Sequence, residues 1–352
     1  MNIILIIIFL INQNLCNEIT NSSFLLSFQR ERKILEKINN INLDKNKKNL
    51  ILGTIVGYTW DIILPFIKSI VNANLINTDI IIFGRKISNL LIKNLKSYGI
   101  TFYTIPDKYK NIKIINSRWK IYLDFLEKNR NKYNLILSID VRDTIIQNDI
   151  FSIYKYKKSF LCCSLEDETL EENWNKLSII KLYNKEIHEV IKNKKIINGG
   201  TFLGTVNIFI DFIKELWKHI VLSPNSVDQI IINYLIYYKK ILNDYVIFYD
   251  NYSPIMTIAL TKRKNIILDS KNRIINYKGE IASIVHQYDR HRDISLIINE
   301  KLCPELIKYL NDKKNILYIS CFIEIIAVIL IIKGYLIIFL LKKNLFYFII
   351  DT

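Results

Sequence analysis

The residues most suggestive of chemistry are two aspartates, Asp140 and Asp143, which follow the apolar run 134–139. An apolar strand that ends in two carboxylates three residues apart would present both of them on one turn. Because like charges repel at this spacing, a cation between them stabilises the pair, and Mg2+ and Mn2+ bind carboxylate oxygen readily. Taken alone, the pattern also fits a turn that Asp143 caps and a pairing of Asp140 with a lysine. The spacing therefore predicts a metal site only if other residues support it.

A glycine-containing turn and an acid-amide pair are the next candidates. Asn198, Gly199 and Gly200 lie in the string IINGGTFLG, which holds three of the nine glycines in the chain. Such clustering in a glycine-poor chain indicates a tight turn or a close approach of the backbone to a ligand. Asp228 and Gln229 open the helical pattern 229–238, where they either cap the helix or contact a ligand.

His286 is the candidate third metal ligand. It ends the apolar run 284–285 as Asp140 ends its own run, and two of the four histidines of the chain lie within 286–291. A single histidine is most often structural. A histidine at a strand end, in a domain that already has two closely spaced aspartates, is a credible ligand for the same ion.

Short apolar runs alternate with helical patterns from residue 49 onward, and this order determines where the candidate ligands lie. The expected strands cover 50–56, 79–83, 100–105 and 134–139, and the expected helices cover 61–71, 87–98 and 117–130. This βαβ alternation predicts an α/β fold with a Rossmann-like mixed, mostly parallel sheet and covering helices. Ligands of such sheets bind beyond the carboxyl ends of the strands, which is where the DVRD string is expected.

The order of these motifs resembles that of the metal-dependent glycosyltransferases of the GT-A fold, over roughly residues 49–293. The shared order is a nucleotide-binding half, a helix carrying Arg118 and Tyr122, an apolar strand leading into DVRD, an Asn-Gly-Gly turn, an Asp-Gln pair and a late histidine. The spacing is similar to that of the glycosyltransferase domain of lysyl hydroxylases. The strings DVRDTIIQNDIF and VHQYDRH look like those of a group of uncharacterised GT-A-like proteins. The resemblance implies one GT-A-like domain over residues 49–300.

The resemblance also implies a role for each candidate residue. The ligands of Mn2+ or Mg2+, which grips the diphosphate of a UDP-sugar donor, would be Asp140, Asp143 and His286. The uridine site would be lined by Thr54, Gly57 and Tyr58, and Arg118 would contact the phosphates or orient the DxxD loop. The donor sugar or the acceptor would be bound by Asn198, Gly199, Gly200 and Gln229, with Asp228 as the acid near the reacting centre.

The expected reaction is the transfer of a hexose from a UDP-sugar to a protein or glycan acceptor in the lumen. Breaking the donor bond develops negative charge on the leaving diphosphate, and a bound cation stabilises that charge as a Lewis acid. The sequence departs from the family in its three-residue acid spacing and in a C-terminal anchor. A catalytically silent luminal protein that keeps the fold and binds a glycan, a nucleotide or a membrane partner is therefore an alternative. A haloacid dehalogenase type of hydrolase is disfavoured because Arg142 stands where its second aspartate is needed.

Apolar segments at both ends predict a membrane protein of the secretory pathway. We interpret residues 1–16 as a signal peptide, 17–48 as a lead-in, 301–315 as a juxtamembrane segment, 316–341 as a transmembrane helix and 342–352 as a short tail. The expected location is the endoplasmic reticulum or Golgi membrane, with the catalytic domain in the lumen. An uncleaved N-terminal segment is an alternative, because no Lys or Arg precedes the apolar run. A buried C-terminal helix is another, because Glu324 and Lys333 interrupt the apolar stretch.

Composition restricts the class further. The chain has 352 residues, of which 50% are hydrophobic and 23% charged, as is typical of globular proteins. The net charge of +16 comes from scattered lysines without a basic stripe interleaved with aromatic residues, so no nucleic-acid partner is expected. The five cysteines do not form a disulfide framework, and Cys162 and Cys163 lie in an apolar run that predicts a buried strand.

Overall fold

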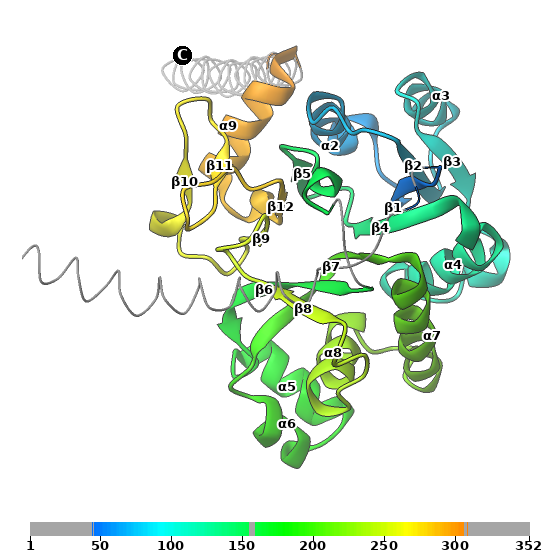
Figure 1. Cartoon of the computed structure of the whole chain (residues 1–352), viewed down its shortest axis with the longest axis vertical. Helices are drawn as coiled ribbons and strands as arrows, with labels where there is room; N and C mark the ends of the chain where they lie inside the picture. Colours follow the sequence, from blue (N-terminus) through cyan, green and yellow to red (C-terminus); the bar gives the residue numbers. More distant parts are fainter. Residues whose placement is uncertain (1–43, 45, 155–158, 306–307, 309–352) are drawn as a thin grey trace, which may run out of the picture. The chain divides into compact units, whose positions relative to one another are not determined.

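A seven-stranded sheet with the order β3-β2-β1-β4-β7-β6-β8 organises the fold (Figure 1). Its strands are β1 (Lys48–Val56), β2 (Thr78–Arg85), β3 (Thr101–Thr104), β4 (Tyr133–Ile139), β6 (Leu161–Thr169), β7 (Lys195–Thr205) and β8 (Val246–Tyr249). The first four strands are mutually parallel, and β7 runs antiparallel to both β4 and β6. The sheet is thus mixed and mostly parallel, which confirms the expected fold class.

The computed structural model describes residue 44 and residues 46–154, 159–305 and 308. The chain divides into two compact units, Met1–Ile298 and Asn299–Thr352, and the sheets lie in the first. The expected signal peptide, transmembrane helix and tail lie outside the described residues, as do nearly all of the lead-in and most of the juxtamembrane segment. Within the described part of the chain, no helix combines the length and the apolar character that crossing a membrane requires.

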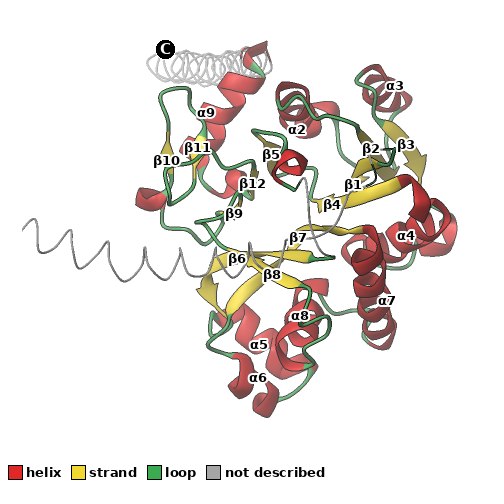
Figure 2. Cartoon of the chain, viewed as in Figure 1, coloured by secondary structure: helices red, strands yellow, loops and turns green. Residues whose placement is uncertain are grey.

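The helices of the first unit cover both faces of the sheet (Figure 2). They are α2 (Trp60–Asn72), α3 (Asn89–Ser97), α4 (Ile114–Asn129), α5 (Asn173–Leu182), α6 (Lys185–Ile191), α7 (Val206–Leu222) and α8 (Asp228–Asn233), which continues as a π-helical turn, Tyr234–Tyr238. The helix α9 (Arg292–Leu302) begins in the first unit and ends in the second. The strands and helices expected between residues 50 and 139 are all present, with ends shifted by a few residues.

Two apolar cores fill the space on either side of the sheet because residues of β1 alternate between its faces. Leu50 packs in one core with Trp119 of α4 and Phe212 of α7. Ile51 packs in the other core, which includes Phe66 of α2. Cys162 and Cys163 of β6 are both buried, which confirms the expected buried strand.

A smaller three-stranded sheet stands beside the carboxyl end of β4. It has the order β5-β12-β9 and consists of β5 (Thr144–Ile146), β12 (Ile284–His286) and β9 (Ile255–Thr257), with a two-stranded sheet of β10 (Ile267–Leu268) and β11 (Ile274–Ile275) nearby in the chain. Ser69 of α2 anchors it, because its hydroxyl accepts a hydrogen bond from the backbone N–H of Ile146 at 3.0 Å. This sheet brings a late segment of the chain next to the DVRD loop.

Asn233 ties α8 to β7 through the backbone. Its side chain is fully buried, its Oδ1 accepts a hydrogen bond from the N–H of Ile197 at 2.9 Å, and its Nδ2 donates to the carbonyls of Ile197 and Gln229 at 2.9 and 2.8 Å. Ile197 directly precedes the Asn-Gly-Gly string, which continues the strand β7. Asn233 therefore fixes the distance between that part of β7 and the start of α8.

Replacing Asn233 with alanine should destabilise the protein, because both backbone groups of Ile197 lose their side-chain partner inside the core. We expect the free energy of unfolding of Asn233→Ala to fall by about 2 to 4 kcal/mol, measured by denaturant unfolding. The exposed Asn207, which accepts one surface hydrogen bond from Arg130, is the control, and Asn207→Ala should cost about 0.5 kcal/mol or less. Equal losses in the two variants would contradict this role.

Candidate functional site

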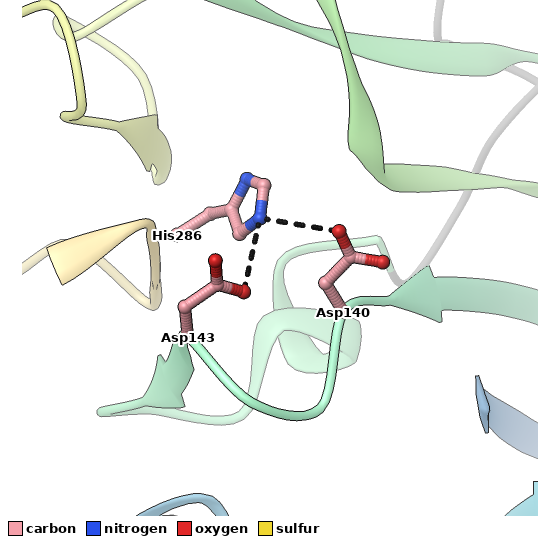
Figure 3. A group of neighbouring side chains, drawn as sticks. All are labelled: Asp140, Asp143 and His286. Atoms are coloured by element: carbon pink, nitrogen blue, oxygen red, sulfur yellow. Dashed lines mark ion pairs between the residues drawn. The ribbon is translucent and has the colours of Figure 1, made fainter. Parts of the chain in front are cut away.

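Asp140, Asp143 and His286 form one cluster at the carboxyl end of β4 (Figure 3). Each offers one ligand atom, and these atoms all lie within 4.8 Å of one another. The imidazole Nε2 of His286 lies 3.7 Å from Oδ2 of Asp140 and 3.5 Å from Oδ1 of Asp143. The structure thus brings the three predicted metal ligands together from two segments that are far apart in the sequence.

Strand pairing accounts for the position of each member of the cluster. Asp140 directly follows β4, and its backbone N–H donates to the carbonyl of Gly200 on β7 at 3.0 Å. Asp143 directly precedes β5, whose Thr144 lies opposite His286 in the antiparallel pair with β12. The N–H of Gln287 also donates to the carbonyl of Asp143, at 2.6 Å. The cluster is therefore held by backbone hydrogen bonds rather than by side chains alone.

Cationic side chains keep both aspartates ionised. Burial alone would raise the pKa of the Asp140 carboxyl, but Arg118 and His286 outweigh burial and hold this pKa below its usual value. The same balance lowers the pKa of the buried Asp143, where His286 and Arg142 oppose the effect of burial. Arg290 also pairs with Oδ2 of Asp143, at 3.2 Å. Two ionised carboxylates are the state that binds a divalent cation.

His286 is 1% exposed, and neither of its ring nitrogens has a hydrogen-bond partner within the part of the chain that the structure describes. Burial alone would lower the pKa of the imidazole, but the two neighbouring carboxylates raise it to about 9. A buried nitrogen that faces two carboxylate oxygens without a hydrogen bond fits a metal ligand, because coordination would satisfy all three groups at once. The donor set of two carboxylates and one imidazole suits a divalent cation such as Mn2+.

Gly200 provides the space that the cluster occupies. A Cβ atom at this position would lie 2.3 Å from Cε1 and 2.6 Å from Nε2 of His286, and 2.7 Å from Oδ2 of Asp140. At the neighbouring Gly199, the same construction meets only ordinary contacts, at 3.4 Å or more. The expected tight turn is wrong, because Asn198, Gly199 and Gly200 lie within the strand β7. Glycine is required at Gly200 by the close approach of two candidate ligands.

Arg118 connects this cluster to the other predicted binding residues. Its guanidinium pairs with Asp140 through Nη1, and its Nη2 donates to the carbonyl of Gly199 and to Oδ2 of Asp228, both at 2.7 Å. Gln229 accepts a hydrogen bond from the N–H of Gly199 at 3.1 Å. All of these residues therefore belong to one connected network.

Asp228 is fully engaged within this network. Besides Arg118, the indole N–H of Trp119 donates to its Oδ2 at 2.8 Å, and the N–H of Gln229 donates to its Oδ1 at 2.8 Å. Burial raises the pKa of this carboxyl against the opposing effect of Arg118. Its contacts are those of a residue that positions Arg118 and the start of α8, and its expected role as an acid at the reacting centre stays a prediction.

A cleft of about 270 Å3 opens above the metal cluster. Thr54 and Tyr58 of the predicted uridine site line it together with Arg118, Asp140, Arg142 and Arg290. Gly57 lies between Val56 and Tyr58 at the end of β1, where its φ of 67° is the left-handed conformation that glycine accepts most readily. The end of β1 and the DVRD loop thus form the walls of one cleft, as expected for the carboxyl edge of the sheet.

Glu166 contacts the Asn-Gly-Gly string and was not among the residues expected from the sequence. It lies on β6, is 5% exposed, and accepts a hydrogen bond from Nδ2 of Asn198 at 2.7 Å, while Oδ1 of Asn198 accepts one from the N–H of Gly200 at the same distance. Burial raises the pKa of its carboxyl despite that hydrogen bond. Glu166 also ends an apolar run, as Asp140 does, but Asp167 and Glu168 follow it, and the sequence alone does not single out one of the three.

Comparisons with known proteins concern the fold. No protein-family model matches the chain, and no curated protein matches its sequence. Among solved structures, the chain is similar to an active-site mutant of LgtC, with a TM-score of 0.47 and 12% identity, over 71% of this chain and 95% of that one. It is similar to the bifunctional glycosyltransferase WbbM, with a TM-score of 0.45 and 13% identity, over 76% of this chain and 53% of that one.

A third similar structure is the glycosyltransferase GlyE of Streptococcus pneumoniae, with a TM-score of 0.42 and 14% identity, over 74% of this chain and 64% of that one. These structures are glycosyltransferases, the class that the sequence motifs resemble. At such scores the likeness carries no inference about the chemistry of this chain. The functional proposal rests on the chain's own residues.

Adding one methyl group at Gly200 should destroy the metal site. We expect Gly200→Ala to lower the affinity for Mn2+ at least tenfold, measured by isothermal titration calorimetry, because the Cβ atom would displace His286 or Asp140. Gly199→Ala is the matched control in the same strand and should change the affinity less than threefold. Equal losses in both variants would show that the backbone of β7, rather than the space beside His286, determines binding.

Proposed function

We propose that the chain is a glycosyltransferase that moves a hexose from a UDP-sugar to an acceptor, with Mn2+ held by Asp140, Asp143 and His286. The observation that carries this proposal is the gathering of these three residues beside a cleft that Asp140 and Asp143 line together with Thr54 and Tyr58, while His286 lies buried behind them. A cation placed there would supply a Lewis acid that stabilises the charge developing on a leaving diphosphate.

The cationic rim of the cleft supports a diphosphate as the bound group. Arg142 and Arg290 both contact Oδ2 of Asp143, and 43% and 40% of their side chains stay exposed. A guanidinium presents parallel N–H donors that fit phosphate oxygens in pairs. Each arginine can therefore orient a phosphate while it still holds Asp143. The order of motifs, which resembles that of the metal-dependent GT-A glycosyltransferases, supports a UDP-sugar as the donor.

Glu166 is the carboxyl group that fits proton exchange with an acceptor hydroxyl. Among the described residues it accepts one hydrogen bond, from Asn198, whereas Asp228 accepts three strong ones. Its raised pKa brings it closer to neutral pH, where a general base is most effective. Asn198 joins Glu166 to Gly200 and hence to the metal cluster.

The location of the protein belongs to the proposal as well. The apolar segments 1–16 and 316–341 support an endoplasmic reticulum or Golgi membrane protein whose body, and therefore whose acceptor, lies in the lumen. Protection of residues 49–300 from added protease in sealed microsomes is the expected result. Digestion of this region in intact microsomes would contradict a luminal site.

Release of UDP from a panel of UDP-sugars by the purified full-length chain tests the activity, because donor hydrolysis requires no acceptor. We expect one donor to turn over only with Mn2+, and Asp140→Asn, Asp143→Asn and His286→Ala each to lower the rate by at least about 100-fold. Asp289→Asn is the control, since Asp289 lies beside Arg142 and Arg290 but outside the cluster, and it should retain the rate within about threefold.

Turnover of a UDP-sugar without metal, or an active Asp143→Asn variant, would contradict the proposal. Mn2+ binding without turnover of any donor would favour the catalytically silent binding protein over the enzyme.

Glu166→Gln tests the proton transfer separately. The amide keeps a group that can hydrogen-bond Asn198 but cannot accept a proton, so we expect kcat of transfer to an acceptor to fall at least about tenfold, with Mn2+ affinity unchanged. Asp228→Asn should instead lower the melting temperature, because Arg118 and Trp119 lose a buried anionic partner. An unchanged kcat in Glu166→Gln would remove Glu166 from the reaction.

A further inference from the structure

A second cavity, of about 460 Å3, opens between α5 and residues 223–227, which join α7 to α8. We call it the Trp174 cavity, after the residue that lines it at the start of α5. It is larger than the cleft above the Asp-Asp-His cluster and shares no lining residue with that cleft. Its volume lies within the range of about 300 to 1,000 Å3 that is typical of small-molecule sites. Nothing in the proposed reaction uses it so far.

The lining combines an apolar wall with short polar groups. Trp174, 48% exposed, shares the apolar wall with Leu182 and Ile230, while Ser178 and Ser226 contribute hydroxyl groups. A sugar ring has a face of C–H groups that packs against an indole ring, and a rim of hydroxyls that exchange hydrogen bonds with serine side chains. The two kinds of surface in this cavity match those two parts of a saccharide.

The charges of the lining argue against a metal ion and against a nucleoside diphosphate as the ligand. Lys181 is the charged residue among the described residues that line the cavity, and the lining contains no carboxylate, histidine or cysteine. A metal ion would find no ligand set there. A nucleoside diphosphate would meet a single lysine and no arginine among the lining residues, whereas Arg118, Arg142 and Arg290 line the cleft above Asp143. A neutral or anionic saccharide fits this lining.

One wall of the cavity is held in place before any ligand arrives. Asn116 of α4 donates through Nδ2 to the carbonyls of Pro224 and Ser226, at 3.0 and 2.8 Å, and Lys113 donates to the carbonyl of Asn225 at 3.0 Å. Asn116 itself is fully buried. A rigid wall lowers the entropic cost of binding, as expected of a site rather than of an accidental hollow.

Both walls connect directly to the reaction network. Val227, in the lining, is followed by Asp228, which Arg118 holds. On the other wall, Asn175 follows Trp174 and accepts a hydrogen bond at 3.3 Å from Gln229, which in turn accepts one from the N–H of Gly199. A ligand in the cavity therefore lies across α8 from the predicted donor site.

We infer that the Trp174 cavity binds a saccharide portion of the acceptor, which packs against the indole ring of Trp174 and sets which acceptors the chain modifies. That the bound saccharide belongs to the acceptor rests on the proposed glycosyltransferase function. That the cavity binds a saccharide rests on its lining alone. It assigns acceptor recognition to α5 and residues 223–227, and donor recognition to the cleft at the end of β4.

Binding of the labelled full-length chain to an array of immobilised neutral and uronic-acid oligosaccharides tests the inference. We expect binding to a subset of these glycans, and Trp174→Ala should weaken the affinity for the best of them at least tenfold. Leu177→Ala is the matched control, because Leu177 is 58% exposed on the same helix but does not line the cavity, and it should stay within twofold. Trp174→Phe, which keeps an aromatic face, should retain more affinity than Trp174→Ala.

Two readouts separate this inference from the proposed reaction. His286→Ala should abolish UDP release while leaving glycan binding intact. Trp174→Ala should weaken glycan binding while leaving the acceptor-independent release of UDP intact. No bound glycan on the array, undiminished binding by Trp174→Ala, or an equal loss in Leu177→Ala would overturn the inference. Trp174-dependent glycan binding in a chain that turns over no donor would support the saccharide site and contradict the enzyme.

Discussion

The balance of buried charge at the end of β4 is the constraint on which the rest of the site depends. Asp140 and Asp143 stand close together, Asp228 is buried nearby, and three ionised carboxylates so placed would be unstable without compensation. Arg118 supplies this compensation, because its guanidinium forms one ion pair with Asp140 and another with Asp228. This one guanidinium links α4 to α8 and to the end of β4, and it also reaches the carbonyl of Gly199 on β7.

The same balance distinguishes structural from functional charge. Asp228 has its acceptor capacity filled by a guanidinium, an indole and a backbone N–H, and such saturation favours a fixed geometry over reactivity. The imidazole of His286 faces two anions without a hydrogen bond, and Glu166 has one. Incompletely satisfied polar groups cost stability in a folded protein, and they gather here at the carboxyl edge of the sheet, where ligands of α/β folds bind.

The sequence was sufficient for the features that local pattern encodes. The βαβ order, the buried strand holding Cys162 and Cys163, and the acids at the end of β4 depend on short runs of residues and were expected correctly. Local pattern did not give the strand pairing over long distances, although the resemblance placed His286 with Asp140 and Asp143. The strand β12 has three residues and no periodicity to detect, so its pairing with β5 appears only in three dimensions. Glu166 and the Trp174 cavity were not predicted for the same reason, since neighbours from distant segments define both.

The separation of the cluster along the chain has a consequence for biosynthesis. A ribosome makes Asp140 and Asp143 well before β12, and the imidazole that completes the set arrives only with that strand. Arg118 can neutralise Asp140 from the start, because it precedes both aspartates in the chain. An ion that needed all three side chains could bind only after synthesis had passed residue 286.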